Sequence, residues 1–286
     1  MKTYNDIYLS TRRKLRDVAA GAHDLEARLI VSHASGKSRE ELISHSKFFV
    51  TDHDVLNALD DMVERRLGGE PVAYLVGEWE FYGLPINVNR DVLIPRVDTE
   101  LLAETAIKLM KKHSGHTRLL DLCTGTGCVG LAIAATVPDC RVVLADNCER
   151  AIAVCKSNML RNNITRNATP IILDALEPPP ALLGTFDAIV CNPPYIPTED
   201  IKTLDKSVSG FEPLSALDGG PDGLEFFRAI TSKWTFLLSK GGHLLFECGY
   251  GQAQSVRVIL EENGYKEIVT HVDTKGIDRV IQGTIR

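Results

Sequence analysis

Short β-rich segments alternate with helical segments from residue 118 onward in this 286-residue chain. This alternation predicts a parallel, doubly wound α/β sheet with helices on both faces. Ligands of such sheets bind at the carboxyl ends of the strands, beside the point where the strand order reverses, so a site is expected directly after a strand. The expected strands are 118–122, 141–145, 169–173, 186–191 and 243–247, and the expected helices include 148–162 and 223–238.

The residues before this region have a different pattern. Residues 1–77 show only helical periodicity. Leu59 and Met62, for example, belong to the apolar face of one expected helix. Gly68 and Gly69 follow it and are expected to end this helix in a left-handed turn. This pattern predicts a small helical bundle at the N-terminal end of the chain.

A short extended segment follows the helical one. Aromatic and polar side chains alternate around Gly83, which predicts two short strands joined by a turn. A helix is then expected to begin near Asp98 or Thr99. The expected organisation is an N-terminal helical domain in residues 1–77, a β-hairpin connector in residues 78–90 and an α/β domain in residues 91–286.

Charge and composition restrict the partners. The chain has 32 Lys and Arg against 38 Asp and Glu, a net charge of −6, so a broad surface that neutralises phosphates is not expected and no direct nucleic-acid binding is predicted. The apolar runs are shorter than the roughly 18 residues that span a bilayer, and the N-terminus lacks the apolar core of a secretory signal. Seven cysteines without a Cys-x-x-Cys pair indicate reduced thiols. We therefore expect a cytoplasmic protein, a monomer without membrane contact or bound metal.

A glycine-rich turn follows the strand 118–122. Gly125 and Gly127 let the backbone approach a ligand without a side chain in the way. Together with Gly130 the string also matches the dinucleotide-binding fingerprint, and Asp146 stands where a ribose acceptor would be expected. From these residues alone, NAD and S-adenosylmethionine are both candidate ligands.

Acidic residues near the strand ends favour S-adenosylmethionine. Asp121 stands four positions before Gly125. A carboxylate at this position could accept the amino group at the methionine end of S-adenosylmethionine. Beside the diphosphate of NAD it would have no group to bind. Asp146 could accept both ribose hydroxyls through its two oxygens. Asp174, followed by Ala175, ends the third strand where the edge of an adenine would lie.

The fourth strand runs into Asn192-Pro193-Pro194-Tyr195. The prolines restrict the residues before them to extended conformations, so their carbonyl groups are oriented before a substrate arrives. The side-chain oxygen of Asn192 and the backbone oxygen of Pro193 could each accept one N–H of a planar NH₂ group. The ring of Tyr195 could pack against that planar group.

This arrangement suits methyl transfer to an amide or aromatic amine nitrogen. The lone pair of such a nitrogen is delocalised, and two acceptors on its N–H bonds favour the pyramidal transition state over the planar ground state. Holding the nitrogen about 3–3.5 Å from the methyl group supplies much of the remaining rate. No dedicated base is required.

The chain resembles the HemK-type release-factor glutamine methyltransferases, also called the PrmC family, over nearly its full length. The resemblance implies a Rossmann-like S-adenosylmethionine-dependent methyltransferase domain and an N-terminal helical domain that docks the release factor. It also implies methylation of the glutamine in the Gly-Gly-Gln motif of class I peptide chain release factors, which modulates translation termination, with S-adenosylhomocysteine as product. The segments that carry the likeness are 77–83, 93–100, 121–127, 192–195 and 211–217.

The resemblance also implies roles for individual residues. Asn192, Pro193, Pro194 and Tyr195 are expected to hold the glutamine. The residues expected at the cofactor are Arg96, Asp121, Cys123, Thr124, Gly125, Thr126, Gly127, Asp146, Asp174, Ala175 and Asn192.

The chain departs from the family pattern at three positions. Cys123 replaces a usual glycine, a change that the turn accommodates if φ at this position is negative, and Val97 replaces a common proline. Ala175 replaces a frequent aromatic residue, a change that would weaken adenine stacking by about 1 kcal/mol. Glu212 and Glu247 are expected to have structural or surface roles.

Two other functions are compatible with parts of the pattern. Asn-Pro-Pro-Tyr is shared with enzymes that methylate amino groups of nucleobases in DNA or rRNA. A non-catalytic module that binds S-adenosylmethionine or NAD is the other alternative, although such a module would have no need for two oriented acceptors.

Overall fold

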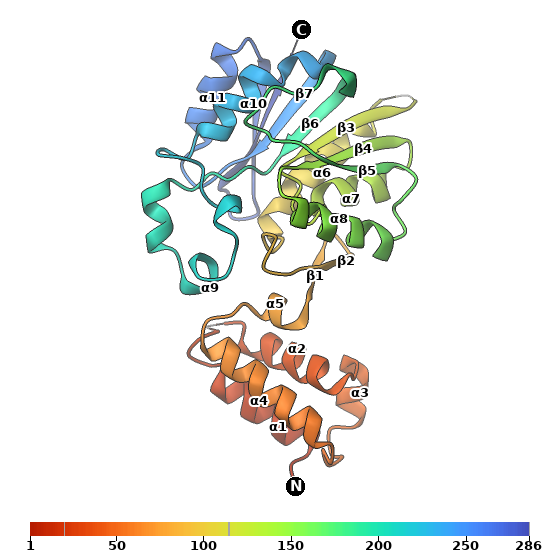
Figure 1. The fold of residues 1–286 in the computed structure, drawn as a ribbon, viewed down its shortest axis with the longest axis vertical. Coiled ribbons are helices and arrows are strands. Elements are labelled where there is room, and N and C mark those ends of the chain that lie inside the picture. Colours follow the sequence, from red (N-terminus) through yellow and green to blue (C-terminus); the bar gives the residue numbers. More distant parts are fainter. Residues whose placement is uncertain (20, 114, 286) are drawn as a thin grey trace. The chain divides into compact units, whose positions relative to one another are not determined.

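The computed structural model describes residues 1–19, 21–113 and 115–285. The chain forms two compact units, shown by sequence colour in Figure 1. Residues 1–78 and 205–211 make up a helical unit, and residues 79–204 and 212–286 make up an α/β unit.

The helical unit is built from short helices around an apolar core. Leu59, Met62 and Val63 of one helix are buried, as the periodicity predicts. That helix is followed by Gly68 with φ −70° and Gly69 with φ +105°, so only the second glycine is left-handed. The helices are α1 (Tyr4–Lys14), α2 (His23–Ser35), α3 (Arg39–Ser44), α4 (His53–Leu67), α5 (Val72–Val76) and α9 (Lys206–Ser209).

A buried ion pair crosses this unit. The guanidinium of Arg66 donates to both carboxylate oxygens of Glu26, at 2.7 and 3.1 Å, and also to the carbonyl of Val18 at 3.2 Å. The pair ties α4 to α2 and to the chain before α2.

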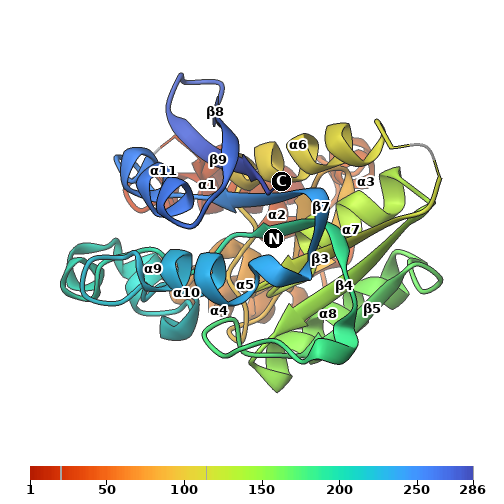
Figure 2. The same cartoon turned by 90° about the horizontal axis from the view of Figure 1, so that it is seen from above.

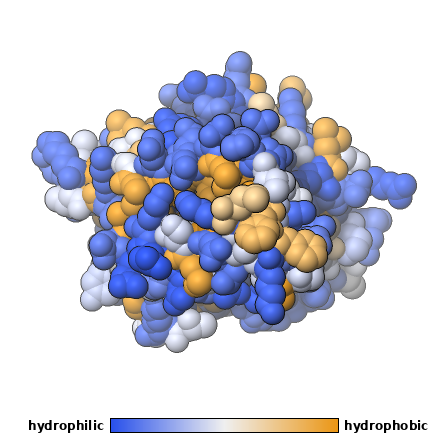
Figure 3. All heavy atoms as spheres, turned by 90° about the horizontal axis from the view of Figure 1, so that it is seen from below, coloured by the Kyte–Doolittle hydropathy of each residue, from blue (hydrophilic) through white to orange (hydrophobic). Residues whose placement is uncertain are grey.

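Apolar side chains also reach the surface of this unit: Phe48 is 60% exposed and Phe49 is 57% exposed. Figure 3 shows a face of the molecule on which apolar and hydrophilic side chains intermix.

The expected β-hairpin is present. Strands β1 (Glu78–Phe81) and β2 (Leu84–Asn87) are joined by Tyr82 and Gly83, whose φ angles of 51° and 76° are typical of a tight hairpin turn. The backbone N–H of Asn87 donates to the side-chain oxygen of Asn158 at 2.6 Å, and the Asn158 amide donates back to the Asn87 carbonyl at 3.1 Å. The second strand is thereby fixed to helix α8 (Glu149–Arg161).

A seven-stranded sheet forms the centre of the α/β unit, with the strand order β5-β4-β3-β6-β7-β9-β8. All five strands expected from the sequence are present and pair in parallel. The strands are β3 (Thr117–Leu122), β4 (Cys140–Asp146), β5 (Ala168–Ile172), β6 (Phe186–Cys191), β7 (Leu238–Glu247), β8 (Lys266–Val272) and β9 (Asp278–Thr284).

Near one edge the sheet departs from the parallel arrangement, because β9, a strand that the sequence analysis did not identify, runs antiparallel to both β7 and β8. The turn between β8 and β9 is short and is closed by Asp273, whose carboxylate accepts the N–H groups of Lys275 and Ile277. A connection this short can only join antiparallel strands, since a parallel pair needs a crossover of a dozen or more residues.

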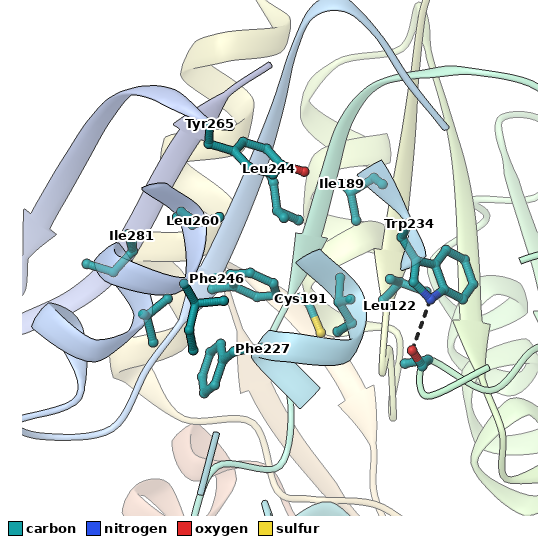
Figure 4. Close-up of a cluster of buried hydrophobic side chains, with 14 of the residues drawn as sticks. Leu122, Ile189, Cys191, Phe227, Trp234, Leu244, Phe246, Leu260, Tyr265 and Ile281 are labelled. Carbon is teal, nitrogen blue, oxygen red and sulfur yellow. Dashed lines mark hydrogen bonds between the residues drawn. The ribbon is translucent and has the colours of Figure 1, made fainter. Parts of the chain in front are cut away.

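Helices cover both sides of the sheet (Figure 2). On one side, Leu122, Ile189 and Phe246 pack with residues of α10 and α11 (Figure 4). In the same cluster the indole N–H of Trp234 donates to the carbonyl oxygen of Ala175 at 2.9 Å. On the other side α7 packs against β3 and β4. Besides α8, the helices of the α/β unit are α6 (Glu100–Met110), α7 (Cys128–Thr136), α10 (Glu225–Lys233) and α11 (Ala253–Glu262). Short 3₁₀ segments cover Val97–Thr99, Ala181–Leu183, Thr198–Thr203, Leu214–Ala216 and Thr235–Leu237.

The strand order identifies the place for a site. From β3 the chain continues to β4 and β5 on one side, and β6 and β7 lie on the other. The carboxyl ends of β3 and β6 therefore meet where the order reverses, which is where open α/β sheets bind ligands. Within the described ranges, no helix is long and apolar enough to cross a bilayer.

Candidate active site

A cleft that is open to solvent lies at the carboxyl ends of β3 and β6. Among the predicted site residues, those that line it are Arg96, Asp121, Cys123, Thr124, Gly125, Thr126, Asp146, Ala175, Asn192 and Pro194. Gly127, Asp174, Pro193 and Tyr195 are predicted site residues that do not line it.

Asp121 is held at the base of the cleft. One carboxylate oxygen, Oδ2, accepts the Thr124 hydroxyl at 2.6 Å and the Gly130 N–H at 2.9 Å. A Cβ on Gly130 would lie 2.2 Å from a methyl group of Leu144, so only glycine lets α7 approach the sheet here. Burial raises the pKa of Asp121 to about 7. No donor from the described residues reaches Oδ1, which leaves this oxygen for a ligand.

The conformation of Cys123 does not meet the condition that the sequence analysis set for a side chain here. Its φ is +56°, in the left-handed region, and not negative as the sequence reasoning required. Hydrogen bonds on the following residues hold the turn: the N–H of Thr124 donates to the carbonyl of Ala145 at 3.0 Å, and that of Gly125 donates to Asp146 at 2.9 Å. A side chain in this region costs roughly 1–2 kcal/mol relative to glycine.

Asp146 ends β4 and shapes the same turn. Its Oδ2 accepts the N–H of Gly125, and its Oδ1 accepts the N–H of Cys148 at 3.0 Å. Burial raises the pKa of this carboxyl. Each carboxylate oxygen can accept a second hydrogen bond, so two hydroxyl groups could still be held.

The next strand end contributes an apolar wall. Leu173 and Ala175 line the cleft and Phe226 of α10 also lines it, whereas Asp174 lies between the first two without lining it. The carboxylate of Asp174 accepts the N–H of Leu176 at 2.8 Å. Phe226 is a site residue that the sequence analysis missed, because it comes from a helix and not from a strand end.

Two acceptor oxygens stand free after β6. The side-chain NH₂ of Asn192 donates to the Thr99 hydroxyl at 3.3 Å. No hydrogen bond from the part of the chain that the structure describes reaches the side-chain oxygen of Asn192 or the carbonyl oxygen of Pro193. Neither oxygen is therefore occupied by a donor of the described chain, and their role as acceptors of substrate N–H groups stays a prediction.

Three glycines fix the backbone that carries these acceptors. A Cβ on Gly219 would lie 2.7 Å from Cα of Tyr195, and a Cβ on Gly223 would lie 2.3 Å from the Tyr195 carbonyl oxygen. A Cβ on Gly249 would lie 3.1 Å from the Tyr195 ring. The Tyr195 carbonyl also accepts the side-chain N–H of Gln252 at 2.9 Å. The sequence analysis missed this support because its residues follow Tyr195 at long intervals.

The side chain of Tyr195 does not line the cleft. It packs against the apolar cluster between the sheet and helices α10 and α11, and burial raises the pKa of its hydroxyl well above the usual range. The expected packing of Tyr195 against a substrate group stays a prediction.

Arg96 reaches the cleft from the segment before α6. Its guanidinium pairs with Glu212, whose side chain is almost fully buried and also accepts the N–H of Ile94 at 3.3 Å. Glu212 thus joins two segments of the cleft wall, consistent with the structural role expected for it. Further lining residues that sequence reasoning missed include Val92, Pro95, Thr99 and Asn147.

The sheet order and the cleft beside the strand-order reversal define a Rossmann-like α/β domain. It is similar to the human methyltransferase 10 domain containing protein, with a TM-score of 0.51 and 17% identity over 72% of this chain and 91% of that one. Residues 97–206 match the family model of the methyltransferase small domain, and residues 6–77 match the PrmC N-terminal domain.

Relatives of known family cover nearly the whole chain. The release factor glutamine methyltransferase of Geobacter sulfurreducens is 37% identical over 278 residues, 96% of this chain and 94% of that protein. The protein of the same name from Thermodesulfovibrio yellowstonii is 36% identical over 257 residues, 90% of each chain. The chain belongs to the release factor glutamine methyltransferase family.

Proposed function

We propose that this protein transfers a methyl group from S-adenosylmethionine to the side-chain amide nitrogen of the glutamine in the Gly-Gly-Gln motif of class I peptide chain release factors. The observation that carries the proposal is the pair of free acceptor oxygens, on Asn192 and Pro193, beside a cleft at the strand-order reversal. Membership in the family supports the choice of substrate.

The residues of the cleft fit S-adenosylmethionine. Oδ1 of Asp121 is placed to accept an ammonium group, and a nearby positive charge would favour the ionised form of this buried acid. Asp146 keeps acceptor capacity for two ribose hydroxyls. A Cβ on Gly125 would meet nothing within 4 Å, so the turn leaves open space at the cleft. Leu173, Ala175 and Phe226 offer an apolar wall for an adenine.

The cofactor supplies an electrophilic methyl group on a sulfonium centre, and the protein prepares the nitrogen that receives it. The oxygens of Asn192 and Pro193 would each accept one N–H of the glutamine amide. As the nitrogen becomes pyramidal and positively charged, these hydrogen bonds strengthen, which lowers the barrier. Because Pro193, Pro194 and the glycines packed on Tyr195 fix the acceptors, little reorganisation is needed during the reaction.

The helical unit is proposed to dock the release factor. Residues 1–77 would form the docking domain, residues 78–90 the connector and residues 91–286 the catalytic domain. The match of residues 6–77 to the PrmC N-terminal domain supports this assignment. Since release factors act on ribosomes, we place the reaction in the cytoplasm.

Mass spectrometry of a release factor after incubation with the purified protein and labelled S-adenosylmethionine tests the proposal. We expect a mass shift of one methylene group on the glutamine of Gly-Gly-Gln. A release factor with Asn in place of that glutamine is the control and should take up no label. Label in rRNA or DNA, with none in the release factor, would contradict the proposed substrate.

A further inference from the structure

Helix α8 packs against the glycine turn that follows β3. Residues with helical spacing form the face of α8 that meets the turn and the cleft: Ala151, Cys155 and Asn158. The first of them, Ala151, lines the cleft. A Cβ on Gly127 would lie 2.8 Å from Sγ of Cys155, so the lack of a side chain at this position lets α8 approach the turn closely.

Asn158 joins this turn to the hairpin connector. Its side chain is fully buried, and α8 and β2 lie side by side (Figure 1). The side-chain NH₂ of Asn158 donates to the carbonyl of Thr126 at 2.9 Å and to the carbonyl of Asn87 in β2 at 3.1 Å. The side-chain oxygen accepts the backbone N–H of Asn87 at 2.6 Å. Both hydrogens of the NH₂ group are therefore used, and each is directed at a backbone carbonyl.

These hydrogen bonds permit a single orientation of the Asn158 amide. If the amide were rotated by half a turn, its oxygen would face the carbonyl oxygen of Thr126, and its NH₂ group would face the N–H of Asn87. Both contacts would be repulsive, and buried backbone groups would lose their partners, which is costly. The side chain therefore acts as a fixed link between the hairpin and the turn.

The peptide group between Thr126 and Gly127 is held from both sides. Its N–H, on Gly127, donates to the carbonyl of Thr124 at 2.8 Å, and its carbonyl accepts the NH₂ of Asn158. The N–H and C=O of a trans peptide point in opposite directions, so these two hydrogen bonds fix its orientation. Thr124, Gly125 and Thr126 all line the cleft. The orientation of this peptide therefore shapes the wall that the cofactor is proposed to contact.

We propose that Asn158 is a positioning residue for the binding of S-adenosylmethionine, and that through it the hairpin connector is a structural part of the cofactor site. This inference rests on the proposed binding of S-adenosylmethionine in the cleft. Asn158 does not line the cleft, so it acts through the carbonyl of Thr126 and not by touching the ligand. Without Asn158 that carbonyl loses its donor, and the turn is no longer held in its ligand-binding conformation.

Calorimetry with S-adenosylmethionine tests the role of Asn158. Asn158→Asp keeps the size of the side chain and replaces the NH₂ donor by an oxygen, whereas Asn158→Ser leaves space that water can fill. In both variants we expect the dissociation constant to rise about tenfold or more, because a hydrogen bond to a buried carbonyl is lost. With a release factor and saturating cofactor, kcat should stay within about threefold of the unmodified protein, since the acceptors on Asn192 and Pro193 are unchanged.

Asn167 supplies a matched control. Its side-chain NH₂ also donates to backbone carbonyls, those of Ala134 at 2.9 Å and Cys140 at 3.2 Å, but it lies just before β5 and does not line the cleft. Asn167→Ser should lower the thermal stability and leave the affinity for S-adenosylmethionine within about threefold of the unmodified protein. Equal losses of affinity in Asn167→Ser and Asn158→Ser would show a general effect of instability and refute the positioning role.

Hydrogen exchange in the unmodified protein gives a second test that needs no variant. The backbone N–H of Asn87 donates to Asn158, whereas the N–H of Tyr82, in the turn of the same hairpin, donates to the Glu100 carboxylate at 2.9 Å. Because coupling between two sites is reciprocal, a cofactor that depends on this link must also protect it. With S-adenosylmethionine at about a hundred times its dissociation constant, exchange should slow about tenfold or more at Asn87 and less than about threefold at Tyr82.

The outcomes distinguish this inference from the proposed function. If the unmodified protein binds S-adenosylmethionine and the folded Asn158 variants bind it with unchanged affinity, the positioning role is refuted and the function stands. Equal slowing of exchange at Asn87 and Tyr82, or none at Asn87, would also refute it, and this measurement decides if neither Asn158 variant folds. If the unmodified protein binds no S-adenosylmethionine, the proposed function fails first.

Discussion

The packing of Gly219 against the substrate-binding backbone leads to a quantitative prediction. In Gly219→Ala, the new Cβ would lie 2.7 Å from Cα of Tyr195, 2.8 Å from the carbonyl oxygen of Pro194 and 2.9 Å from the carbonyl carbon of Tyr195. All three are backbone atoms, so relief requires the segment to move by roughly 0.5–1 Å to reach ordinary van der Waals contact. The acceptor oxygens of Asn192 and Pro193 would move with it.

The expected effect is on catalysis more than on cofactor binding. A displacement of this size should slow methyl transfer about tenfold to a hundredfold, and overpacking should lower the free energy of unfolding by about 1–3 kcal/mol. The assays are single-turnover methylation of a release factor, calorimetry with S-adenosylmethionine and urea unfolding. S-adenosylmethionine affinity should change little, because Gly219 does not line the cleft.

A matched control distinguishes displacement of the acceptors from simple destabilisation. Gly276 lies in the β8–β9 turn at φ +77°, and a Cβ there would meet nothing within 4 Å. Gly276→Ala should therefore cost about 1 kcal/mol of stability through its backbone conformation without slowing the reaction. A Gly219→Ala protein that methylates at the unmodified rate would refute the argument that this packing fixes the acceptors.

Three further predictions concern stability. Cys123→Gly removes a side chain from φ +56° and should raise the free energy of unfolding by about 1 kcal/mol in urea titrations; a loss of stability would show that the thiol contributes more than its backbone costs. Glu247→Gln should raise the free energy of unfolding by at most roughly 3 kcal/mol near pH 8 and should not change it near pH 4. The reason is the raised pKa of Glu247: the stability associated with this group is fully present below about pH 4.5 and is lost as the pH rises through about 7. Equal effects at the two pH values would contradict this prediction. Glu26→Ala leaves the Arg66 charge buried without its partner and should lower the stability of the helical unit by about 3–5 kcal/mol in thermal unfolding, whereas a loss below about 1 kcal/mol would show that water compensates the charge.

The parts of the molecule that could be predicted from the sequence are those set by local patterns. The strand 186–191 was predicted with its observed bounds, because a run of apolar residues ends at a proline pair. The cleft lies at strand ends because parallel α/β sheets place ligands there, and the glycine turn after β3 was recognisable from its spacing.

The parts that could not be predicted depend on contacts between distant segments. The edge strand β8 has no fully buried residue, so its apolar pattern is weak, and the buried run of its neighbour β9 is only four residues long, Val280–Gly283. The left-handed φ of Cys123 is imposed by hydrogen bonds to β4, which a reading of the turn alone does not contain. The hydrogen bond from Asn192 to Thr99 likewise joins two segments that lie far apart in the sequence.

The single-turnover rate of Asn192→Ala tests the central claim most directly. With a release factor and saturating S-adenosylmethionine, removal of one oriented acceptor should slow methyl transfer by about a hundredfold or more, while the affinity for S-adenosylmethionine stays within about threefold of the unmodified protein. A folded Asn192→Ala protein that methylates glutamine at close to the unmodified rate would show that the nitrogen is prepared by some other group.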